Sequence, residues 1–413
     1  MSEHRVAGSG EAPRHPDQET NRRDRDRADL PRGGFRLARR LRPTAAKVLC
    51  VAAAGGVALT CSAASVTHGA AMAGTTPGTS SYLTEQVQFL AGHQLSDGAI
   101  LGPGDEINPY FANMAAIGLA QADTPAADTI VYTWMHWYLG HLNAEDDNGL
   151  TDTIYDYSYD PSSGAETSTG SYDSVDSYAA TALMLAYTGY LTGDSQIQSL
   201  VSTNITTYEA IANLDDYPAP AGVRQSDGLT VAIPGGAAYT MDNAEVAAGL
   251  SEFAQLEAKL NRSRQSTYYQ GWANTTVQAM TKPASAGGLW DAANDNWDWA
   301  LGSASDPASA FYPDATAQLW PVLFGVVSPA SAQATAAWQA FTGAYPSWDT
   351  DGIPASAGYP WTSMARAAQL MGDTSGASTL LTTLEDKYAP DWGGNWYDDE
   401  AGWFLLAATS TNP

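Results

Sequence analysis

Apolar residues recur with the spacing of an α-helix from Ser80 to the end of the chain, and stretches rich in Gly, Pro and Asp interrupt them. This pattern predicts a series of twelve helices. We expect them at about 81–92, 108–121, 125–141, 174–192, 195–213, 240–261, 265–281, 312–327, 330–342, 358–372, 375–388 and 400–409. Extended structure is expected only as a short strand at 229–233 and a loop edge at 153–157, and neither is expected to build a sheet.

Several predicted helices carry start signals. A proline follows Asn108, Thr124 and Ser328, as in the first turn of a helix, and Asp follows Gly at 193–194 and 372–373, where one helix ends and the next begins.

The predicted connections alternate in length. Those into the third, fifth, seventh, ninth and eleventh helices are short, whereas those into the fourth, sixth, eighth and tenth are long and rich in Asp, Tyr, Trp and Gly. Helices after long connections are richest in small apolar residues, as at 112–120 and 179–186, which indicates that they are the inner ones. The sequence therefore predicts an all-α protein, an (α/α)6 toroid of six helical hairpins, whose long loops gather at one end around a cleft. A two-domain helical bundle is the alternative.

Charge divides the 413-residue chain into two parts. Residues 1–73 hold 12 of the 19 Lys and Arg but only 7 of the 45 Asp and Glu, so residues 74–413 carry 7 basic and 38 acidic residues. So acidic a domain argues against nucleic acid and anionic membranes as partners.

The basic first part has the order of an export signal. A basic stretch at 36–47 leads into an apolar run at 48–59, and small residues follow up to an Ala-Met-Ala string at 71–73. We predict cleavage after residue 73 and an extracellular domain over 74–413. A membrane anchor is the alternative, for which the apolar run is short, since a span needs about 20 residues.

Both cysteines, Cys50 and Cys61, lie in this first part, so the mature domain is predicted to contain no disulfide. A lipid anchor at Cys61 and a twin-arginine export route through 39–40 remain open alternatives.

Acidic residues recur at the starts of the helices that follow long loops. They are Asp97, Asp105, Glu106, Asp156, Asp173, Asp176, Asp242, Glu245, Asp314, Asp398, Asp399 and Glu400. Asp and Glu are common in any first helical turn, where they cap free N–H groups and oppose the helix dipole. Two pairs exceed that requirement, Asp173 with Asp176 and Asp242 with Glu245, because residues three apart share a helix face. For the second pair, an ordinary capped helix start over residues 240–245 is the alternative.

Two segments resemble the six-hairpin glycosidase superfamily, and the resemblance extends over roughly residues 80–410. Residues 105–120 (DEINPYFANMAAIGLA) are similar to the start of the first inner helix, and residues 172–183 (YDSVDSYAATAL) to the Asp-rich start of the next one, most closely in glycoside hydrolase family 8. The resemblance implies that Glu106, or alternatively Asp105, is the proton donor, and that an Asp of the second segment binds the sugar at the cleavage point. The Ser-Glu-Gly-Met-Gly string is absent, and no motif places the catalytic base.

Glycoside hydrolysis needs a carboxylic acid to protonate the leaving oxygen and a carboxylate to activate water or to attack the sugar. We predict Glu106 as the acid and Asp176 or Asp173 as its partner, with Asp242 in reserve as the base.

Aromatic rings on the long-loop side are expected to stack on sugar faces. The predicted platforms are Tyr110, Tyr155, Tyr172, Trp290, Trp297, Trp299, Trp361 and Trp396. Asp105 and Asn243 are predicted to add polar contacts to the substrate. Burial against the barrel wall is the alternative for the three Trp of residues 290–299.

Other chemistries find little support. The loop at 145–152 lacks the frame and distal Glu of a calcium loop, and no Gly-x-Ser-x-Gly elbow is present. We therefore expect no metal and no cofactor. The leading hypothesis is a secreted, monomeric glycoside hydrolase that acts on a neutral polysaccharide or oligosaccharide. A non-catalytic carbohydrate-binding protein on the same barrel is the alternative, while a lyase is disfavoured because the mature domain has few cations.

Overall fold

The computed structural model describes residues 79–350 and 352–409. Its helices are α1 (Thr79–His93), α2 (Pro109–Ala122), α3 (Pro125–Gly140), α4 (Val175–Leu191), α5 (Ser195–Thr203), α6 (Ile205–Asp216), α7 (Thr240–Lys259), α8 (Ser263–Thr281), α9 (Trp320–Leu323), α10 (Ala332–Ala344), α11 (Ser363–Leu370), α12 (Thr374–Tyr388) and α13 (Asp398–Thr409). None of the helices in the described part has both the length and the apolar character that a membrane span requires. The predicted export signal, residues 1–73, lies outside the described residues.

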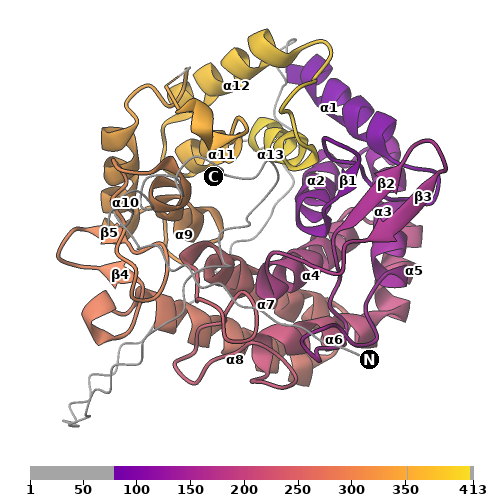
Figure 1. Cartoon of the computed structure of the whole chain (residues 1–413), viewed down its shortest axis with the longest axis horizontal. Helices are drawn as coiled ribbons and strands as arrows, with labels where there is room; N and C mark the ends of the chain where they lie inside the picture. The colour runs from indigo at the N-terminus through magenta and orange to yellow at the C-terminus, as the bar shows by residue number, and fades with distance from the viewer. Residues whose placement is uncertain (1–78, 351, 410–413) are drawn as a thin grey trace, which may run out of the picture. The chain divides into compact units, whose positions relative to one another are not determined.

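The inner helices form a closed ring (Figure 1). Each of α2, α4, α7, α9 and α11 contacts the next, and α13 closes the ring against α2. Helices α1, α3, α5, α6, α8, α10 and α12 lie outside them. This arrangement confirms the predicted (α/α)6 toroid and excludes two separate bundles for the described residues.

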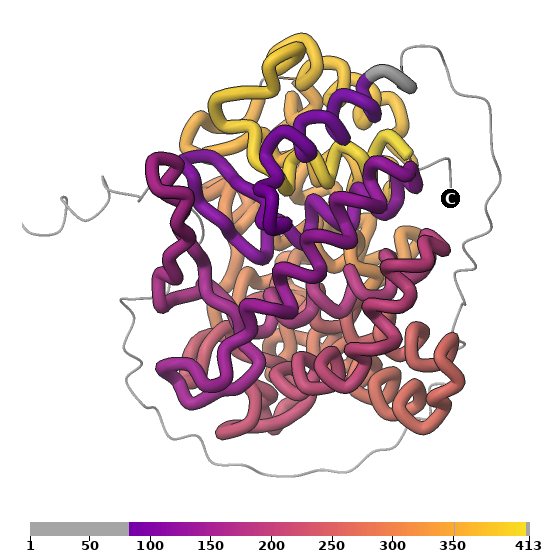
Figure 2. The backbone as a smooth tube through the Cα atoms, turned by 90° about the vertical axis from the view of Figure 1, so that its right-hand side faces the viewer, coloured from indigo at the N-terminus to yellow at the C-terminus, as the bar shows by residue number. Residues whose placement is uncertain are grey.

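The connections also follow the predicted alternation. Those that enter the inner helices are long, at 94–108, 141–174, 217–239, 282–310, 345–362 and 389–397. All of them join an outer helix to an inner one, so they meet at the same end of the ring, here named the loop end. The side view of Figure 2 shows the connection 141–174 at this end of the helices.

Small residues let the inner helices pack closely. A Cβ atom added at Gly118 of α2 would lie 2.3 Å from the carbonyl oxygen of Gly402 in α13, and one added at Gly249 of α7 would lie 2.6 Å from that of Ala180 in α4. The small-residue pattern therefore identified the inner helices correctly, because only residues without bulk permit this approach.

Most helix starts are as predicted. The Asn108 side chain accepts hydrogen bonds from the backbone N–H groups of Tyr110 and Phe111 at the start of α2, and Asp194 and Asp373 cap α5 and α12. The predicted start of α10 was too early in the sequence. A turn follows Ser328, and the helix begins after Ser331, which caps it.

Two predicted helices are broken. The segment 195–213 is two helices, α5 and α6, that meet at Asn204. The segment 312–327 is a series of irregular turns at 311–318 followed by the short α9. Pro313 and Pro321 lack the N–H group that a continuous helix needs, so Pro321 is tolerated only in the first turn of α9.

A small sheet at the loop end corrects the prediction that no sheet forms. Strands β1 (Glu106–Ile107), β2 (Tyr157–Asp160) and β3 (Ala165–Ser168) pair antiparallel in that order, with Glu106 opposite Ser158. A second pair joins β4 (Trp290–Asp291) to β5 (Asn296–Trp297). The segment 229–233 contributes only an isolated bridge between Thr230 and Arg224.

Candidate active site

Three carboxyl groups meet at the starts of two neighbouring inner helices. Asp173 and Asp176 stand at the start of α4 and Asp242 in the first turn of α7. The Ser174 hydroxyl, which is also the cap of α4, contacts Asp176 Oδ1 at 2.5 Å and Asp242 Oδ2 at 3.1 Å. We name Asp173, Asp176 and Asp242 the acid site. The structure thus brings together three of the four predicted catalytic residues.

Asp173 is the half-buried member of the acid site. Burial and then the nearby Asp156 and Asp176 carboxyls raise the pKa of Asp173 well above its ordinary value. No hydrogen bond among the described residues involves its carboxyl group. A carboxyl group in this position holds its proton more firmly than an exposed one and presents it to whatever binds there.

Asp242 is only 7% exposed. Burial raises the pKa of Asp242 well above its ordinary value, and the carboxyls of Asp176, Glu245 and Asp173 raise it further, while the Ser174 hydroxyl acts in the opposite direction. Each neighbour that takes up a proton therefore makes Asp242 easier to ionise.

Glu245 lies one turn further along α7 and connects three inner helices. Its Oε1 accepts a hydrogen bond of 2.6 Å from the Tyr110 hydroxyl of α2 and one of 2.7 Å from the Trp320 indole N–H of α9. Burial raises its pKa to about 7. Tyr110, predicted as a sugar platform, is instead 7% exposed and serves this buried network.

Four half-buried aromatic rings surround the acid site: Tyr239, Trp299, Tyr312 and Tyr359. Tyr239 stacks on Trp299 with ring centres 5.8 Å apart. The charges of Asp173 and Asp242 both act on the hydroxyls of Tyr239 and Tyr312, and that of Asp173 also acts on Tyr359. We name these four rings the aromatic rim.

Glu106, the acid implied by the resemblance, is not in the acid site. It lies in β1, two residues before the cap of α2, and its side chain is exposed. Its charge acts on Tyr397. Asp105 is also exposed and has a positive φ of 58° in the turn before β1. The prediction placed both at the N-terminus of the first inner helix, but that position belongs to Asn108 and Pro109.

Three predicted sugar platforms are buried, which corrects their assignment. Trp297 is fully buried, Trp396 is 2% exposed and packs against Trp392, and Trp361 is 4% exposed and stacks behind Tyr359. Rings without an accessible face cannot stack on a sugar. For the run 290–299 the barrel-wall alternative is right at Trp297.

Two further residues that were predicted to contact the substrate contact other protein groups instead. Asn243 is fully buried and exchanges hydrogen bonds with the backbone of Thr230. Trp290 is 8% exposed and lies edge-on to Trp297. Neither side chain presents a group to a substrate in this arrangement.

Tyr155 and Tyr172 form a separate stacked pair with ring centres 5.7 Å apart. The Tyr172 hydroxyl donates to Asp146 Oδ2 at 2.5 Å, and the Tyr155 hydroxyl accepts from the backbone N–H of Asp147. Tyr172 also lines a pocket together with Ser174 and residues of α4. Asp146, in the loop 145–152, is thus bound by internal donors, and no three His, Cys, Asp or Glu side chains of 79–350 and 352–409 are arranged to hold a metal ion.

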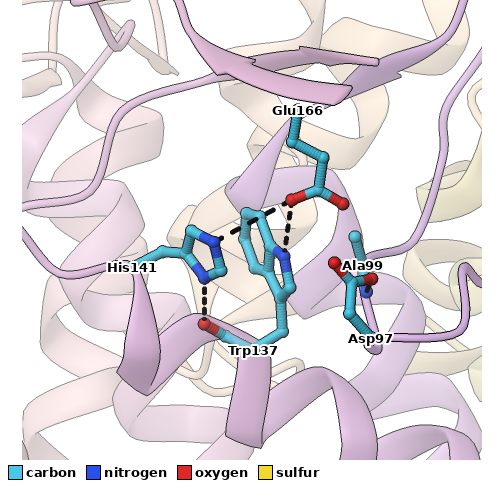
Figure 3. A network of polar contacts seen from close by, with 5 residues as sticks. All are labelled: Asp97, Ala99, Trp137, His141 and Glu166. Carbon is cyan, nitrogen blue, oxygen red and sulfur yellow. Dashed lines mark hydrogen bonds and ion pairs between the residues drawn. The ribbon is translucent and has the colours of Figure 1, made fainter. Parts of the chain in front are cut away.

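The small sheet is fixed to α3 by the contacts shown in Figure 3. Glu166 of β3 accepts a hydrogen bond of 2.9 Å from the Trp137 indole N–H, and His141 Nε2 lies 3.9 Å from the same oxygen. Burial raises the pKa of Glu166, and Asp97 raises it further, against the Trp137 hydrogen bond. These contacts hold in place the sheet that carries Glu106.

The tyrosines of the aromatic rim were not predicted. A signal for them exists in the sequence, because a tyrosine precedes the first acid or proline of several inner helices, as at Tyr239, Tyr312, Tyr359 and Tyr397. Tyr172 before Asp173 repeats this order at α4. The repeated tyrosine before the inner helices, and not the tryptophan-rich segment, is the sequence pattern that indicates the aromatic rim.

No family model matches the sequence, and neither does any curated protein. Among solved structures, the chain is similar to a wild-type glycosidase, at 15% identity over 81% of this chain and 98% of that chain, with a TM-score of 0.53. A variant of a glycosidase in complex with glucose matches at 15% identity over 82% of this chain and 100% of its own, with a TM-score of 0.51. A rhamnosidase from Klebsiella oxytoca with rhamnose bound matches at 12% identity over 81% of this chain and 64% of its own, with a TM-score of 0.53. The shared feature is the fold of six-hairpin glycosidase-type proteins.

Proposed function

We propose that this chain is a secreted glycoside hydrolase that cleaves a neutral polysaccharide or oligosaccharide, with Asp173 as general acid and Asp242 as general base. One observation carries the proposal: a half-buried carboxyl group, without a hydrogen bond to any described residue, lies beside two more carboxyls and an aromatic rim at the loop end of an (α/α)6 toroid. Export as residues 74–413 is part of the proposal, and N-terminal sequencing of the secreted protein tests it.

Asp173 fits the role of the acid. A general acid must hold its proton at working pH and release it to the leaving oxygen as the glycosidic bond breaks. Burial and like charges supply the first property, since they raise the pKa of Asp173. Its lack of an internal acceptor supplies the second, because the proton is not committed to another protein group.

Asp242 fits the role of the base, which takes a proton from the attacking water. This role needs the ionised form. Glu245, with a pKa of about 7, holds its proton at mildly acidic pH, and the raised pKa of Asp173 favours its protonated form as well. The repulsion that these two would exert on Asp242 is then absent, and Asp242 ionises more easily.

The charges favour a neutral substrate. The charges that act on Asp173 and Asp242 belong to other carboxyls. Arg224 is 3% exposed and directs its guanidinium group to the backbone oxygens of Asp215 and Gly228 and to the Thr276 hydroxyl. A uronic-acid polymer would therefore bring its carboxylates next to the acid site without a cation to neutralise them. The likeness to structures with bound glucose and rhamnose supports a sugar ligand.

A substrate panel tests the proposal. Residues 74–413 are incubated with neutral glucans, xylan and mannan and, for comparison, with pectate and alginate, and new reducing ends are assayed from about pH 4 to pH 8. We expect release from at least one neutral polymer and none from the uronic-acid polymers. Binding to a neutral polymer without any release would contradict hydrolysis and would identify a non-catalytic carbohydrate-binding protein.

The aromatic rim gives a separate prediction. Trp299→Ala removes a ring that is stacked on Tyr239 beside the acid site, so we expect the KM for an oligosaccharide to rise about tenfold, which corresponds to about 1.4 kcal/mol, with a small change in kcat. Steady-state kinetics on the substrate found in the panel measure this. Trp338→Ala is the matched control, because Trp338 is equally half-buried but lies on the outer helix α10. An equal rise of KM in both variants would show that the rim does not bind the sugar.

A further inference from the structure

The Ser174 hydroxyl lies between two carboxyl groups of the acid site. Its oxygen is 2.5 Å from Asp176 Oδ1 and 3.1 Å from Asp242 Oδ2. Asp176 is fully buried and Asp242 is 7% exposed. The Ser177 backbone N–H donates to both Asp176 Oδ1 and the Ser174 oxygen, and the Ser177 hydroxyl lies 3.2 Å from the Ser174 hydroxyl.

A proton count limits how these groups are charged. A hydroxyl carries one proton, so it can donate to Asp176 or to Asp242, but not to both. Both contacts are hydrogen bonds only if one of the two carboxyls carries a proton and donates it to the Ser174 oxygen. If both carboxyls were ionised, one carboxylate oxygen would face a lone pair of the Ser174 oxygen with no proton between them. In a buried site this contact is destabilising.

We propose that Asp176 and Asp242 share one acidic proton through Ser174, so that Asp176 holds this proton while Asp242 is ionised and acts as the base. The inference rests on the proposed function for the role of Asp242. Asp176 and Ser174 are then positioning residues, because they act on the reaction only through Asp242.

The two forms of the pair interconvert without any exchange with solvent. In one form Asp242 Oδ2 carries the proton and donates to Ser174, which donates to Asp176. The Asp242 proton then moves to the Ser174 oxygen while the Ser174 proton moves to Asp176 Oδ1. Each of the two proton transfers breaks one O–H bond and forms another, so the net charge of the pair stays constant. Asp242 is left as a carboxylate that can accept a proton from water.

Burial favours the second form. An ion is less stable where it has no contact with solvent, and Asp176 is the more deeply buried of the two. Asp176 Oδ2 also has no hydrogen-bond partner among the described residues. The Ser177 N–H at Oδ1 and the Thr230 side chain act in the opposite direction, because they stabilise the Asp176 anion. The Asp242 carboxylate, in contrast, lies near the half-buried rim residue Tyr239, and its charge acts on the Tyr239 hydroxyl.

Other ionisable groups act on the pair and are present in every variant below. They are Asp173 and Tyr178 of the α4 start, Glu245 of α7, Asp215 at the end of α6, Arg224 of the following loop, and Tyr239 and Tyr312 of the rim.

Two substitutions separate a shared proton from ordinary charge repulsion. In Asp176→Asn the neutral amide donates to Ser174 as protonated Asp176 does, so the acidic limb of the kcat/KM–pH profile stays in place. In Ser174→Ala the donor to the Asp242 carboxylate is lost, so the same limb moves up. Ser174→Thr, which keeps the hydroxyl and the helix cap, leaves the limb in place. Repulsion from an ionised Asp176 predicts instead that the limb moves down in Asp176→Asn, because the substitution removes a negative charge.

Carboxyl ¹³C NMR gives a readout that does not depend on catalysis. The Asp242 signal is assigned by its loss in Asp242→Asn, and its titration is compared among wild type, Asp176→Asn and Ser174→Ala, with melting temperatures to confirm the fold. An Asp242 titration that is unchanged in Asp176→Asn and moves up in Ser174→Ala supports the shared proton even if no substrate is hydrolysed, in which case the proposed function alone fails. An Asp242 titration that moves down in Asp176→Asn, or that is unchanged in Ser174→Ala, overturns the inference.

Discussion

Asp173→Asn is expected to lower kcat on the polysaccharide at least about a hundredfold, because asparagine keeps the size of the side chain but cannot donate a proton to the leaving oxygen. The structure shows why the effect should be large. Within the described part of the chain, the Asp173 carboxyl group has no hydrogen bond to lose, and the residue is half-buried, so the substitution changes little except the chemistry. Steady-state rates of reducing-end release measure the loss.

An activated substrate makes this test specific for the acid. An aryl glycoside of an acidic phenol releases the phenolate without protonation by the enzyme. Asp173→Asn should therefore keep most of its activity on this substrate. Asp242→Asn should lose activity on both substrates, since each needs an activated water. Equal losses of Asp173→Asn on the two substrates would contradict its role as the acid.

Glu106→Gln is the matched control for Asp173→Asn. Glu106 is an exposed acid at the same end of the ring, and it was the acid that the resemblance to known glycosidases implied. We expect a rate within about threefold of wild type, as for most surface substitutions. A large loss in Glu106→Gln together with normal rates in Asp173→Asn would return the acid to β1.

Local sequence rules were sufficient for the ring of helical hairpins, but not for the small sheet at the loop end. The helical spacing of apolar residues shows which side of each helix faces the core. Small residues indicate the inner helices, because residues such as Gly118 and Gly249 let neighbouring helix backbones come into contact. The spacing of three between Asp173 and Asp176 likewise placed both near the start of one helix. Each of these inferences concerns residues that are close in the sequence.

Long-range packing decided what could not be predicted. Whether Trp297 or Trp396 is exposed depends on residues far away, such as Gln318, whose side chain binds the Trp297 backbone, and Gln86, which accepts from the Trp396 indole. Glu106 was misplaced because its strand pairs with β2, about fifty residues further on. The contact between Asp176 and Asp242 through Ser174 was also not predicted, because the ring order places α4 next to α7 but does not determine which side chains meet.

The folded protein is expected to be most stable at mildly acidic pH and to lose on the order of 10 °C in melting temperature between about pH 4.5 and pH 8. Three fully buried acids support this: Glu245, Asp398 and Glu400 each have a pKa raised to about 7, mainly by burial. In the folded state they keep their protons above pH 4.5, whereas in the unfolded chain they ionise near their ordinary values. The native state therefore binds more protons in this range, and stability falls as pH rises through it.

Each such group contributes about 3 kcal/mol across the range, because one pKa unit corresponds to about 1.4 kcal/mol. Repulsion among the many surface carboxylates acts in the same direction, so the two causes must be separated. Salt at about 1 M screens exposed charges but not buried ones, and the buried contribution should survive it. Glu245→Gln keeps an oxygen for the Tyr110 and Trp320 donors but cannot ionise, so the decline of its melting temperature with pH should be shallower than in wild type. Calorimetric melting curves of the two proteins at several pH values, with and without salt, measure this. A wild-type stability that rises from pH 4.5 to pH 8 would show that these carboxyls are not protonated in the folded protein.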